Sequence, residues 1–409
     1  MPIAAVPNYL RNAFNNNFKT ASPALRFNMF LALWGDDWKK VDREKVEVTK
    51  KAATLNDSDI AAMRAIAQRQ QYLAASPAFS AHMLTLCATA TAPFTTGLGN
   101  EHPLENGFAF LTPYGLPYLA GSGVKGVLRQ AARELARGEW GNTHGWSKEE
   151  KYPHPKDPEN KNIQLSMLDV LFGYEADGGE TLHTSGVLDF WDVIPQIKGN
   201  ALAVEVMTPH QGHYYQQKND RKAGASTTPH DSGQPNPITF LTVPPGSAMN
   251  FYVRCDEARL KILAPELLDN WRSLLTAAFE HAFEWLGFGA KTAVGYGAMQ
   301  TEEQRQRRID EEKQRQQQRK EQEKAEAVRQ AEANAETWEG ARFKFNRGNG
   351  MFSAEKSGQT AYASGDDGKQ CFASLPADLQ RKIQTGQFVK GTARIARLDK
   401  EIKLLSVSP

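Results

Sequence analysis

Before residue 300, the chain alternates between strand-like and helix-like hydrophobic patterns. Residues 82–94 and 238–255 contain short apolar runs that alternate with polar or small residues, which is typical of strands. Residues 124–138 and 265–287 repeat apolar positions every three or four residues, as amphipathic helices do. In the second helix, one face collects six apolar residues: Trp271, Leu274, Leu275, Ala278, Phe279 and Ala282. The pattern predicts helices packed on a sheet, and therefore an α+β fold.

The flanking parts of the chain have different patterns. Residues 1–78 are mostly helical in pattern, with Asp and Ser where helix caps are expected. Residues 301–336 hold charged residues, Gln and Ala with almost no large apolar residue, which favours a solvated helical linker over an interaction helix. Residues 337–409 show short alternating stretches broken by glycine-rich turns, which predicts a small all-β barrel module. The fourth part is a central body over residues 79–300.

Composition and charge narrow the possible classes of protein. The 409 residues carry 49 Lys plus Arg and 47 Asp plus Glu, a net charge of +2, which excludes a uniformly basic nucleic-acid coat. The three cysteines, Cys87, Cys255 and Cys371, form no CxxC pair, which argues against a disulfide scaffold and a cysteine zinc site. No signal-peptide pattern and no run of about 18 apolar residues is present. We expect a cytoplasmic protein that contacts no membrane and uses no cofactor.

The first candidate binding motif is the small-residue turn at Gly121 and Ser122, which opens into an amphipathic helix. The unpaired N–H groups at such a helix N-terminus favour a phosphate. Lys125 and Arg129 are four residues apart, so they add two cations on one helix face. A capped helix with solvated basic residues is the other interpretation, and the spacing does not separate the two. The P-loop pattern is not matched.

The second candidate is a glycine-rich loop directly after the long amphipathic helix. Gly287, Gly289, Gly295 and Gly297 let the backbone approach a ligand closely, and Lys291 supplies a charge. A dinucleotide fingerprint needs its glycines between a strand and the following helix. Here the glycines follow a helix and lead into a strand-like stretch, so a nicotinamide or flavin site is not expected.

The third candidate groups His210, His213 and Tyr214 just before a long polar loop with several basic residues. Stacking rings next to cations suit single-stranded or splayed RNA. A turn with solvated aromatic residues is the alternative, and no further ligand is spaced for a zinc site. In the C-terminal module, Phe343 and Phe345 alternate with basic residues, as in OB and cold-shock barrels that bind single strands, but both rings could instead point into the core.

The sequence resembles the RAMP superfamily of CRISPR proteins, and within it the sixth-subunit family of type III-B (Cmr) effector complexes. The resemblance runs from about residue 80 to Gly297 and excludes the charged linker and the β module. Four segments carry it: Thr96–Gly107, Gly121–Gly126, Met207–His210 with His213 and Tyr214, and Gly287–Gly297.

The resemblance implies a tandem body of two ferredoxin-like, RRM-type halves and a non-catalytic subunit of the complex backbone. Such a subunit holds the crRNA near its 3′ end and the guide–target duplex, so the expected partners are crRNA, target RNA and the backbone, small and first Cmr subunits. The RNA-binding residues expected on this basis are Gly121, Ser122, Lys125, Arg129, His210, His213, Tyr214, Gly287, Gly289, Lys291, Gly295 and Gly297. No catalytic or metal-binding residue is expected.

Two other functions remain open from the sequence. One is a RAMP endoribonuclease that processes precursor crRNA without a metal, with His210 or His213 and Tyr214 as acid–base candidates. The other is a cold-shock-like RNA chaperone that depends only on the C-terminal module.

Overall fold

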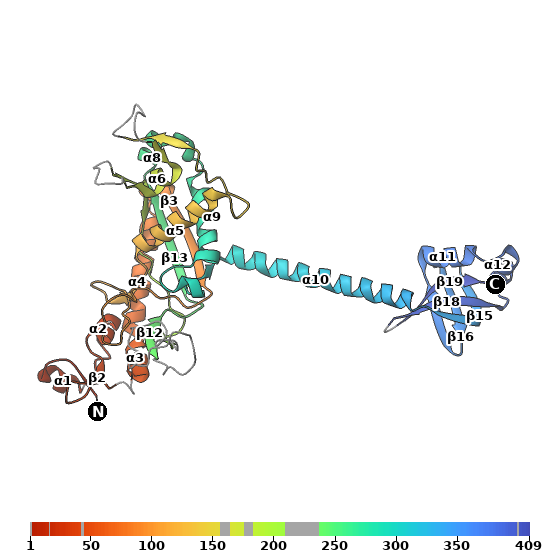
Figure 1. Ribbon diagram of the computed structural model, residues 1–409, viewed down its shortest axis with the longest axis horizontal. Helices are drawn as coiled ribbons and strands as arrows, with labels where there is room; N and C mark the ends of the chain where they lie inside the picture. Colours follow the sequence, from red (N-terminus) through yellow and green to blue (C-terminus); the bar gives the residue numbers. More distant parts are fainter. Residues whose placement is uncertain are drawn as a thin grey trace, which may run out of the picture. The chain divides into compact units, whose positions relative to one another are not determined.

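The structure is a computed structural model that describes residues 2–15, 17–41, 45–155, 164–175, 183–208, 237–398 and 401–409. The chain divides into two compact units, Met1–Arg305 and Gln306–Pro409 (Figure 1). Each unit contains its own large hydrophobic core. No helix in the described ranges is both long and apolar enough to cross a membrane.

A four-stranded antiparallel sheet forms the centre of the first unit, in the order β10-β13-β3-β14. Its strands are β3 (Met83–Ala90), β10 (Leu188–Phe190), β13 (Ala248–Cys255) and β14 (Met299–Gln300). The long pairing of β3 with β13 runs from Thr89 opposite Ala248 to Met83 opposite Arg254. These two strands lie within the two stretches that the sequence pattern predicted as strands, which confirms that prediction.

Helices α5 (Gly121–Arg137) and α9 (Trp271–His281) pack against each other and share the core with the sheet (Figure 1). The six apolar residues predicted on one face of the second helix are all buried, so that prediction is confirmed. In chain order the unit reads β3-α5-β10-β13-α9-β14, the β-α-β-β-α-β arrangement of one ferredoxin-like unit. The described residues show this one unit, and the expected pair of halves is not confirmed.

The N-terminal region is mostly helical, as its pattern indicates. Its elements are β1 (Ile3–Ala4), α1 (Asn8–Phe14), α2 (Pro23–Asn28), β2 (Ala32–Trp34), α3 (Lys45–Ala53) and α4 (Asp57–Ala74). A capping box starts α4: the Asp59 N–H donates to the Asn56 side chain at 2.8 Å, and the Asn56 N–H donates to the Asp59 carboxylate at 2.9 Å. Phe27 and Val48 are buried in the same core as the sheet, so this region is packed into the body.

Short elements surround the sheet. They are η2 (Ser80–His82), β4 (Phe110–Leu111), β5 (Leu116–Pro117), β6 (Lys151–Pro153), β7 (Gln164–Ser166), α6 (Met167–Phe172), β8 (Gly173–Tyr174), β9 (Thr184–Ser185), β11 (Ala203–Met207), β12 (Ile238–Thr242), α8 (Glu257–Leu263), η4 (Pro265–Leu267), the π-helix η5 (Ala282–Leu286) and η6 (Thr292–Val294). β11 and β12 form an antiparallel hairpin in which Met207 lies opposite Ile238. This hairpin packs on α3.

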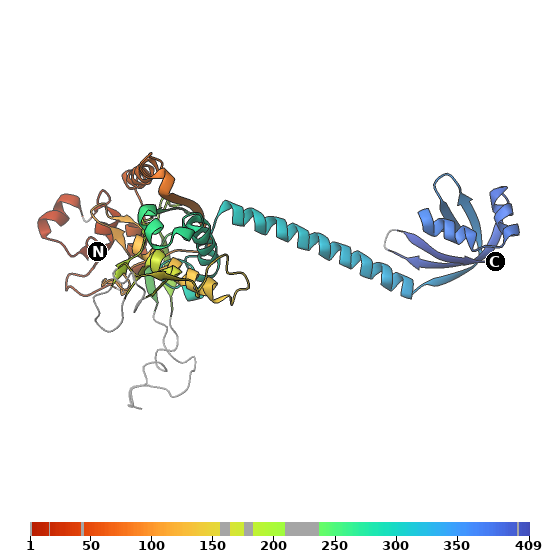
Figure 2. The same cartoon turned by 90° about the horizontal axis from the view of Figure 1, so that it is seen from above.

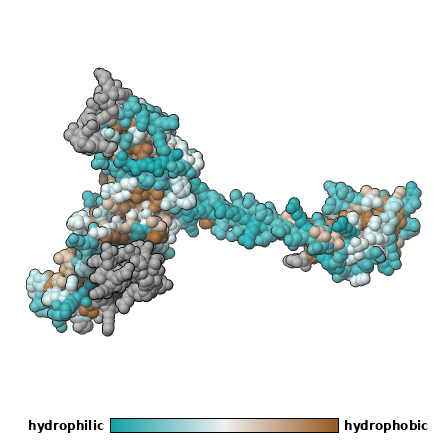
Figure 3. All heavy atoms as spheres, viewed as in Figure 1, coloured by the Kyte–Doolittle hydropathy of each residue, from teal (hydrophilic) through white to brown (hydrophobic). Residues whose placement is uncertain are grey.

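The charged run forms α10 (Glu302–Ala333), one continuous helix (Figure 2). Its surface is hydrophilic along the face seen in Figure 3. Exposed ion pairs connect successive turns, such as Glu311 with Arg315 at 3.5 Å and Arg319 with Glu323 at 3.0 Å. Each such pair stabilises a helix by only about 0.3–0.5 kcal/mol, so strong helix-forming residues and many small local terms hold α10 together.

The second unit contains a closed barrel in the order β15-β16-β17-β19-β18, with β17 and β19 parallel. Its elements are β15 (Glu336–Asn346), β16 (Met351–Lys356), β17 (Gln359–Ala363), α11 (Gly365–Ala373), α12 (Ala377–Gln384), β18 (Val389–Arg397) and β19 (Ile402–Ser408). The predicted barrel is confirmed, but the prediction of an all-β module is wrong. Cys371 of α11 and Ile383 of α12 are buried in the barrel core, and Leu379 of α12, four residues before Ile383, packs against it, so one face of each helix is apolar.

The two aromatic residues of β15 belong to that core. Phe343 is buried against Phe352, with ring centroids 5.5 Å apart. Phe345 is half-buried and stacks on Phe372 of α11 at 4.3 Å. The inward-pointing alternative is therefore the correct interpretation for both rings.

Candidate nucleic-acid interface

The N-terminus of α5 is built for close packing. A Cβ atom on Gly121 would overlap the carbonyl oxygen of Phe190, so only glycine fits where the helix meets the end of β10. The Gly121 N–H donates to Asp192 Oδ1 at 2.7 Å. An anion therefore already lies at this helix N-terminus, and it is a carboxylate of the chain itself. Ser122 is exposed one position further on.

The two basic residues of α5 differ in their surroundings. Arg129 is one third exposed, and its Nη2 lies 3.6 Å from Asp169 Oδ1. Asp169 also caps α6, because its carboxylate accepts the Ser166 N–H at 3.0 Å. Lys125 is half-buried and has no ion-pair partner among the residues that the structure describes. Of the two cations predicted here, Lys125 is thus the more available one.

The glycine-rich loop folds back on the body through backbone contacts. The Phe288 N–H donates to the Gly297 carbonyl at 3.0 Å, and the Gly297 N–H donates to the Pro93 carbonyl at 2.8 Å. A Cβ atom on Gly289 would overlap the Thr95 carbonyl oxygen, and one on Gly297 would overlap the Phe288 carbonyl oxygen. Both glycines also have positive φ angles, +88° and +75°. These positions are glycine because the loop is tightly packed.

The same loop leaves its tip exposed. Gly295 has a φ of +92°, yet a Cβ atom there would meet nothing within 4 Å. Val294, next to it, is 73% exposed. Gly287, at the base of the loop, is closely packed like Gly289 and Gly297, since a Cβ atom there would lie 2.5 Å from the Tyr296 carbonyl oxygen. Packed glycines at the base and an open glycine at the tip give a stiff loop that projects a short turn.

Lys291 connects this loop to the β11–β12 hairpin. Its backbone is left-handed, with a φ of +61°, and its Nζ lies 5.2 Å from the centroid of the Phe240 ring on β12. Nζ also donates to Met207 Sδ at 2.9 Å, at the end of β11. Tyr296 adds a second ring, 6.0 Å from that of Phe240, and burial together with nearby Glu205 raises the pKa of its hydroxyl. Within the described part of the chain, Lys291 has no carboxylate partner.

The two motifs lie at different edges of the sheet. Gly121 meets the end of β10 at one edge, whereas the glycine loop leads into β14 at the other. Lys291 instead lies beside Met207, one residue before the end of the described range 183–208. The predicted RNA-binding residues His210, His213 and Tyr214 fall outside the described residues.

The Thr96–Gly107 segment, which also carries the family resemblance, has a packing role. The His102 ring stacks on Phe27 of α2 with centroids 4.0 Å apart, and its Nε2 is 2.9 Å from the Phe27 carbonyl oxygen. Burial lowers the pKa of His102, so the ring is neutral near pH 7. Leu104 is fully buried, and Glu105 forms an ion pair with Lys45 at 3.2 Å. The segment thus packs against the N-terminal helices and holds them on the body.

A comparison with protein families defines the class. The family model of the RAMP superfamily matches residues 87–300, just over half of the chain. The chain therefore belongs to the RAMP superfamily. The match includes α5 and the glycine loop, whereas all of α10 and the whole barrel lie outside it.

Within this superfamily, the chain is similar to the CRISPR system Cmr subunit Cmr6 of Pyrococcus furiosus. The two are 27% identical over 256 residues, which cover 54% of this chain and 68% of that relative. Among solved structures, the type III-B Cmr-beta complex bound to cognate target RNA matches with 17% identity and a TM-score of 0.38, over 64% of this chain and 70% of the other. The crystal structure of Cmr6 from Pyrococcus furiosus matches with 24% identity and a TM-score of 0.27, over 54% and 98%. These TM-scores are too low to place individual residues.

Proposed function

We propose that this chain is a non-catalytic, RNA-binding backbone subunit of a type III-B CRISPR (Cmr) effector complex. In this proposal it is the counterpart of Cmr6, holds the crRNA near its 3′ end together with the guide–target duplex, and contacts the backbone, small and first Cmr subunits. The family match over residues 87–300 and the similarity to a curated Cmr6 support it. In this proposal the body binds RNA through its glycine loop.

One observation in the site carries the RNA-binding part of this proposal. Lys291 is fixed by a left-handed backbone and by the Phe240 ring, and the chain gives it no carboxylate partner in its described residues. A preorganised cation of this kind is suited to a phosphate group. Gly295, at the tip of the same loop, has open space where a side chain would stand, so the backbone of an RNA can approach there. Sequence is then specified by the guide, and the protein reads backbone and shape.

Reconstitution with shortened guides tests the placement at the 3′ end. The whole set of Cmr subunits from the same locus is assembled on crRNAs that lack nucleotides at either end. Removal of 3′ nucleotides should release this chain while the remaining subunits stay bound, and removal of 5′ nucleotides should not. Release by 5′ trimming alone, or no association with the other subunits at any guide length, would contradict the proposal.

A RAMP endoribonuclease is the alternative function, with His210, His213 and Tyr214 as its candidates. Incubation of the full chain with repeat RNA in the presence of a chelator distinguishes the two functions. The proposal predicts no product. A product with a defined end that disappears in His210→Ala or His213→Ala would contradict the non-catalytic function and support the endoribonuclease.

The division of the chain is also part of the proposal. We infer a body over residues 79–300 with an N-terminal extension over 1–78, a tether over 301–336 and a module over 337–409. The second ferredoxin-like half also stays a prediction. Limited proteolysis should cut first between Arg305 and Arg329, and the fragment Met1–Met299 should still join the complex. A fragment that cannot join would mean that the module belongs to the assembly interface.

A further inference from the structure

The barrel carries a row of residues on its outer surface that the family match does not cover. Residues pair across four neighbouring strands in one register: Lys344 of β15 with Ser353 of β16, Ser353 with Tyr362 of β17, and Tyr362 with Lys403 of β19. Neighbouring strands are about 4.8 Å apart, so the row is about 14 Å long. Phe352 and Ala363, the inward neighbours, are buried, which fixes the row to the outside.

Tyr362 is the aromatic residue at the centre of this row. Tyr362 is 46% exposed, and its neighbours along the strand are the small residues Ala361 and Ala363. An exposed tyrosine ring therefore lies next to the small side chain of Ser353. Such a ring can stack with a nucleobase, and stacking of this type tolerates any base sequence.

Charge favours a polyanion at the same surface. Residues 336–409 contain twelve Lys and Arg against eight Asp and Glu, whereas the rest of the chain has a slight excess of acidic residues. Lys344 and Lys403 lie on either side of Tyr362 and pair with Glu355 at 3.6 Å and Glu332 at 2.9 Å. These are exposed pairs that are worth little, so a phosphate can replace the carboxylates.

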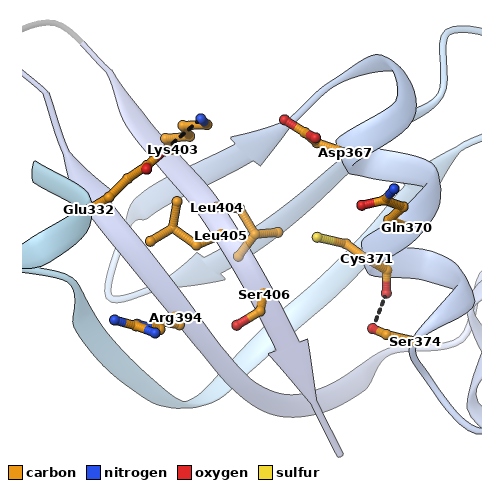
Figure 4. A pocket seen from close by; sticks show the side chains of 10 residues that line it. All are labelled: Glu332, Asp367, Gln370, Cys371, Ser374, Arg394, Lys403, Leu404, Leu405 and Ser406. Atoms are coloured by element: carbon orange, nitrogen blue, oxygen red, sulfur yellow. Dashed lines mark hydrogen bonds and ion pairs between the residues drawn. The ribbon is translucent and has the colours of Figure 1, made fainter. Parts of the chain in front are cut away.

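A hollow continues the row beyond Lys403. It has a volume of about 530 Å³, within the range of ligand pockets, and lies between β19 and α11 (Figure 4). In Figure 4, Arg394 and Lys403 line the strand side, and Gln370 and Cys371 project from α11 opposite them. Arg394 has no ion pair with any carboxylate in the described residues. Glu332 and Asp367 also line the hollow, so the row ends in a polar recess of mixed charge rather than on a flat surface.

We propose that the outer face of β16 and β17 binds single-stranded nucleic acid, with a base on Tyr362 and phosphates at Lys344 and Lys403. The topology supports this: a five-stranded barrel with its helix between the third and fourth strands has the OB arrangement, in which the face of strands two and three binds oligonucleotides. β16 and β17 are the second and third strands here. The proposal does not rest on the function proposed for the body.

Cross-linking of the full chain locates this site. The probes are a 15-nucleotide RNA with 4-thiouridine and a DNA of the same sequence with 4-thiothymidine, cross-linked by ultraviolet light and mapped by mass spectrometry. The tryptic peptide Ser357–Lys369 should carry a cross-link, and comparison of RNA with DNA shows which strand type binds. The peptide Thr292–Arg305 reports the body separately, so failure of one proposal is distinguishable from failure of the other.

Variants make the test specific. Tyr362→Ala should reduce the cross-link at the barrel by about 5- to 100-fold, because a stacked base is lost, whereas Tyr362→Phe should keep it. Phe388→Ala is the matched control, since Phe388 is a 72% exposed aromatic residue outside the row. The absence of a barrel cross-link with both probes in a chain that melts normally would overturn the proposal. Equal yields from wild type and Tyr362→Ala, or capture of a protein by a barrel that gives no cross-link, would also overturn it.

Discussion

At the N-terminus of α5 the chain supplies its own anion, whereas Lys291 of the glycine loop has no carboxylate partner among the described residues. Asp192 accepts the first N–H of α5, and Asp169 lies beside Arg129. Lys291 is held instead by Met207 and Phe240, neither of which neutralises its charge. A phosphate must compete with carboxylates at the helix but not at the loop. Amides and cations in a sequence motif are therefore weaker evidence of a binding site where a partly buried carboxylate of the chain already contacts them, as Asp169 contacts Arg129.

The largest expected effect concerns the packed glycines of the loop. Gly297→Ala should lower the free energy of unfolding by about 3 kcal/mol or more, since a Cβ atom would overlap the Phe288 carbonyl oxygen at a left-handed position. Gly295→Ala, the matched control, should cost only about 1–2 kcal/mol for its positive φ. Urea unfolding of both variants measures the difference. Equal losses would mean that the loop is not packed as described.

The next effect is on RNA affinity. Lys291→Ala should weaken binding of a single-stranded RNA by about tenfold and lower the slope of log affinity against log salt by about 0.7. Arg129→Ala should weaken RNA binding less than threefold, which is about the effect expected for an exposed charge whose interactions are screened by solvent and salt. Lys261→Ala on α8 serves as the control, because α8 follows the far end of β13. Fluorescence anisotropy at several salt concentrations gives both quantities, and a larger loss in Arg129→Ala would reverse the comparison.

A smaller effect is expected when the anion at the helix is removed. Asp192→Ala should lower the free energy of unfolding by about 1 kcal/mol, because the Gly121 N–H loses its acceptor. Asp192→Asn keeps an oxygen acceptor and should retain most of the stability. Thermal unfolding of the two variants compares them directly. An unchanged melting temperature in Asp192→Ala would show that this carboxylate does not stabilise the helix N-terminus.

The smallest effect is a pH dependence at the Thr96–Gly107 segment. Burial lowers the pKa of His102 below its ordinary value of 6.5, so the unfolded chain takes up a proton at higher pH than the folded one. The stability that depends on neutral His102 is therefore complete above about pH 6.5 and declines as the pH falls below it. His102→Gln should flatten that decline in urea midpoints measured from pH 7.5 to 5.5. An unchanged decline in His102→Gln would contradict this assignment.

The regular parts of the fold could be predicted because they follow from periodicity. The buried face of α9 and the strands β3 and β13 are visible as spacings of three to four and of two in the sequence. The two helices of the barrel module were missed because the glycines and aspartates of residues 364–368 resemble a turn. Their apolar spacing from Cys371 to Ile383 was the available signal.

The candidate site was predictable only in its composition. The sequence indicates which loop holds Lys291, but not that Phe240 and Met207, far away in sequence, fix its side chain. Asp192 was missed for the same reason, since its contact with Gly121 depends on the path of the chain after β10. Tyr362 had a weak local signal, a large aromatic residue between two alanines in an alternating strand. Whether that ring points outward depends on the register of the barrel.

Hydrogen–deuterium exchange of the full chain with and without a guide-length RNA tests the central claim most directly. RNA should slow exchange in residues 287–297 and leave the first turn of α5 unchanged, because Lys291 has no carboxylate partner in the described residues, whereas Asp192 already accepts the first N–H of α5. Protection of Gly121 to Lys125 with no change in the loop would contradict this account and would place the RNA at the helix N-terminus instead.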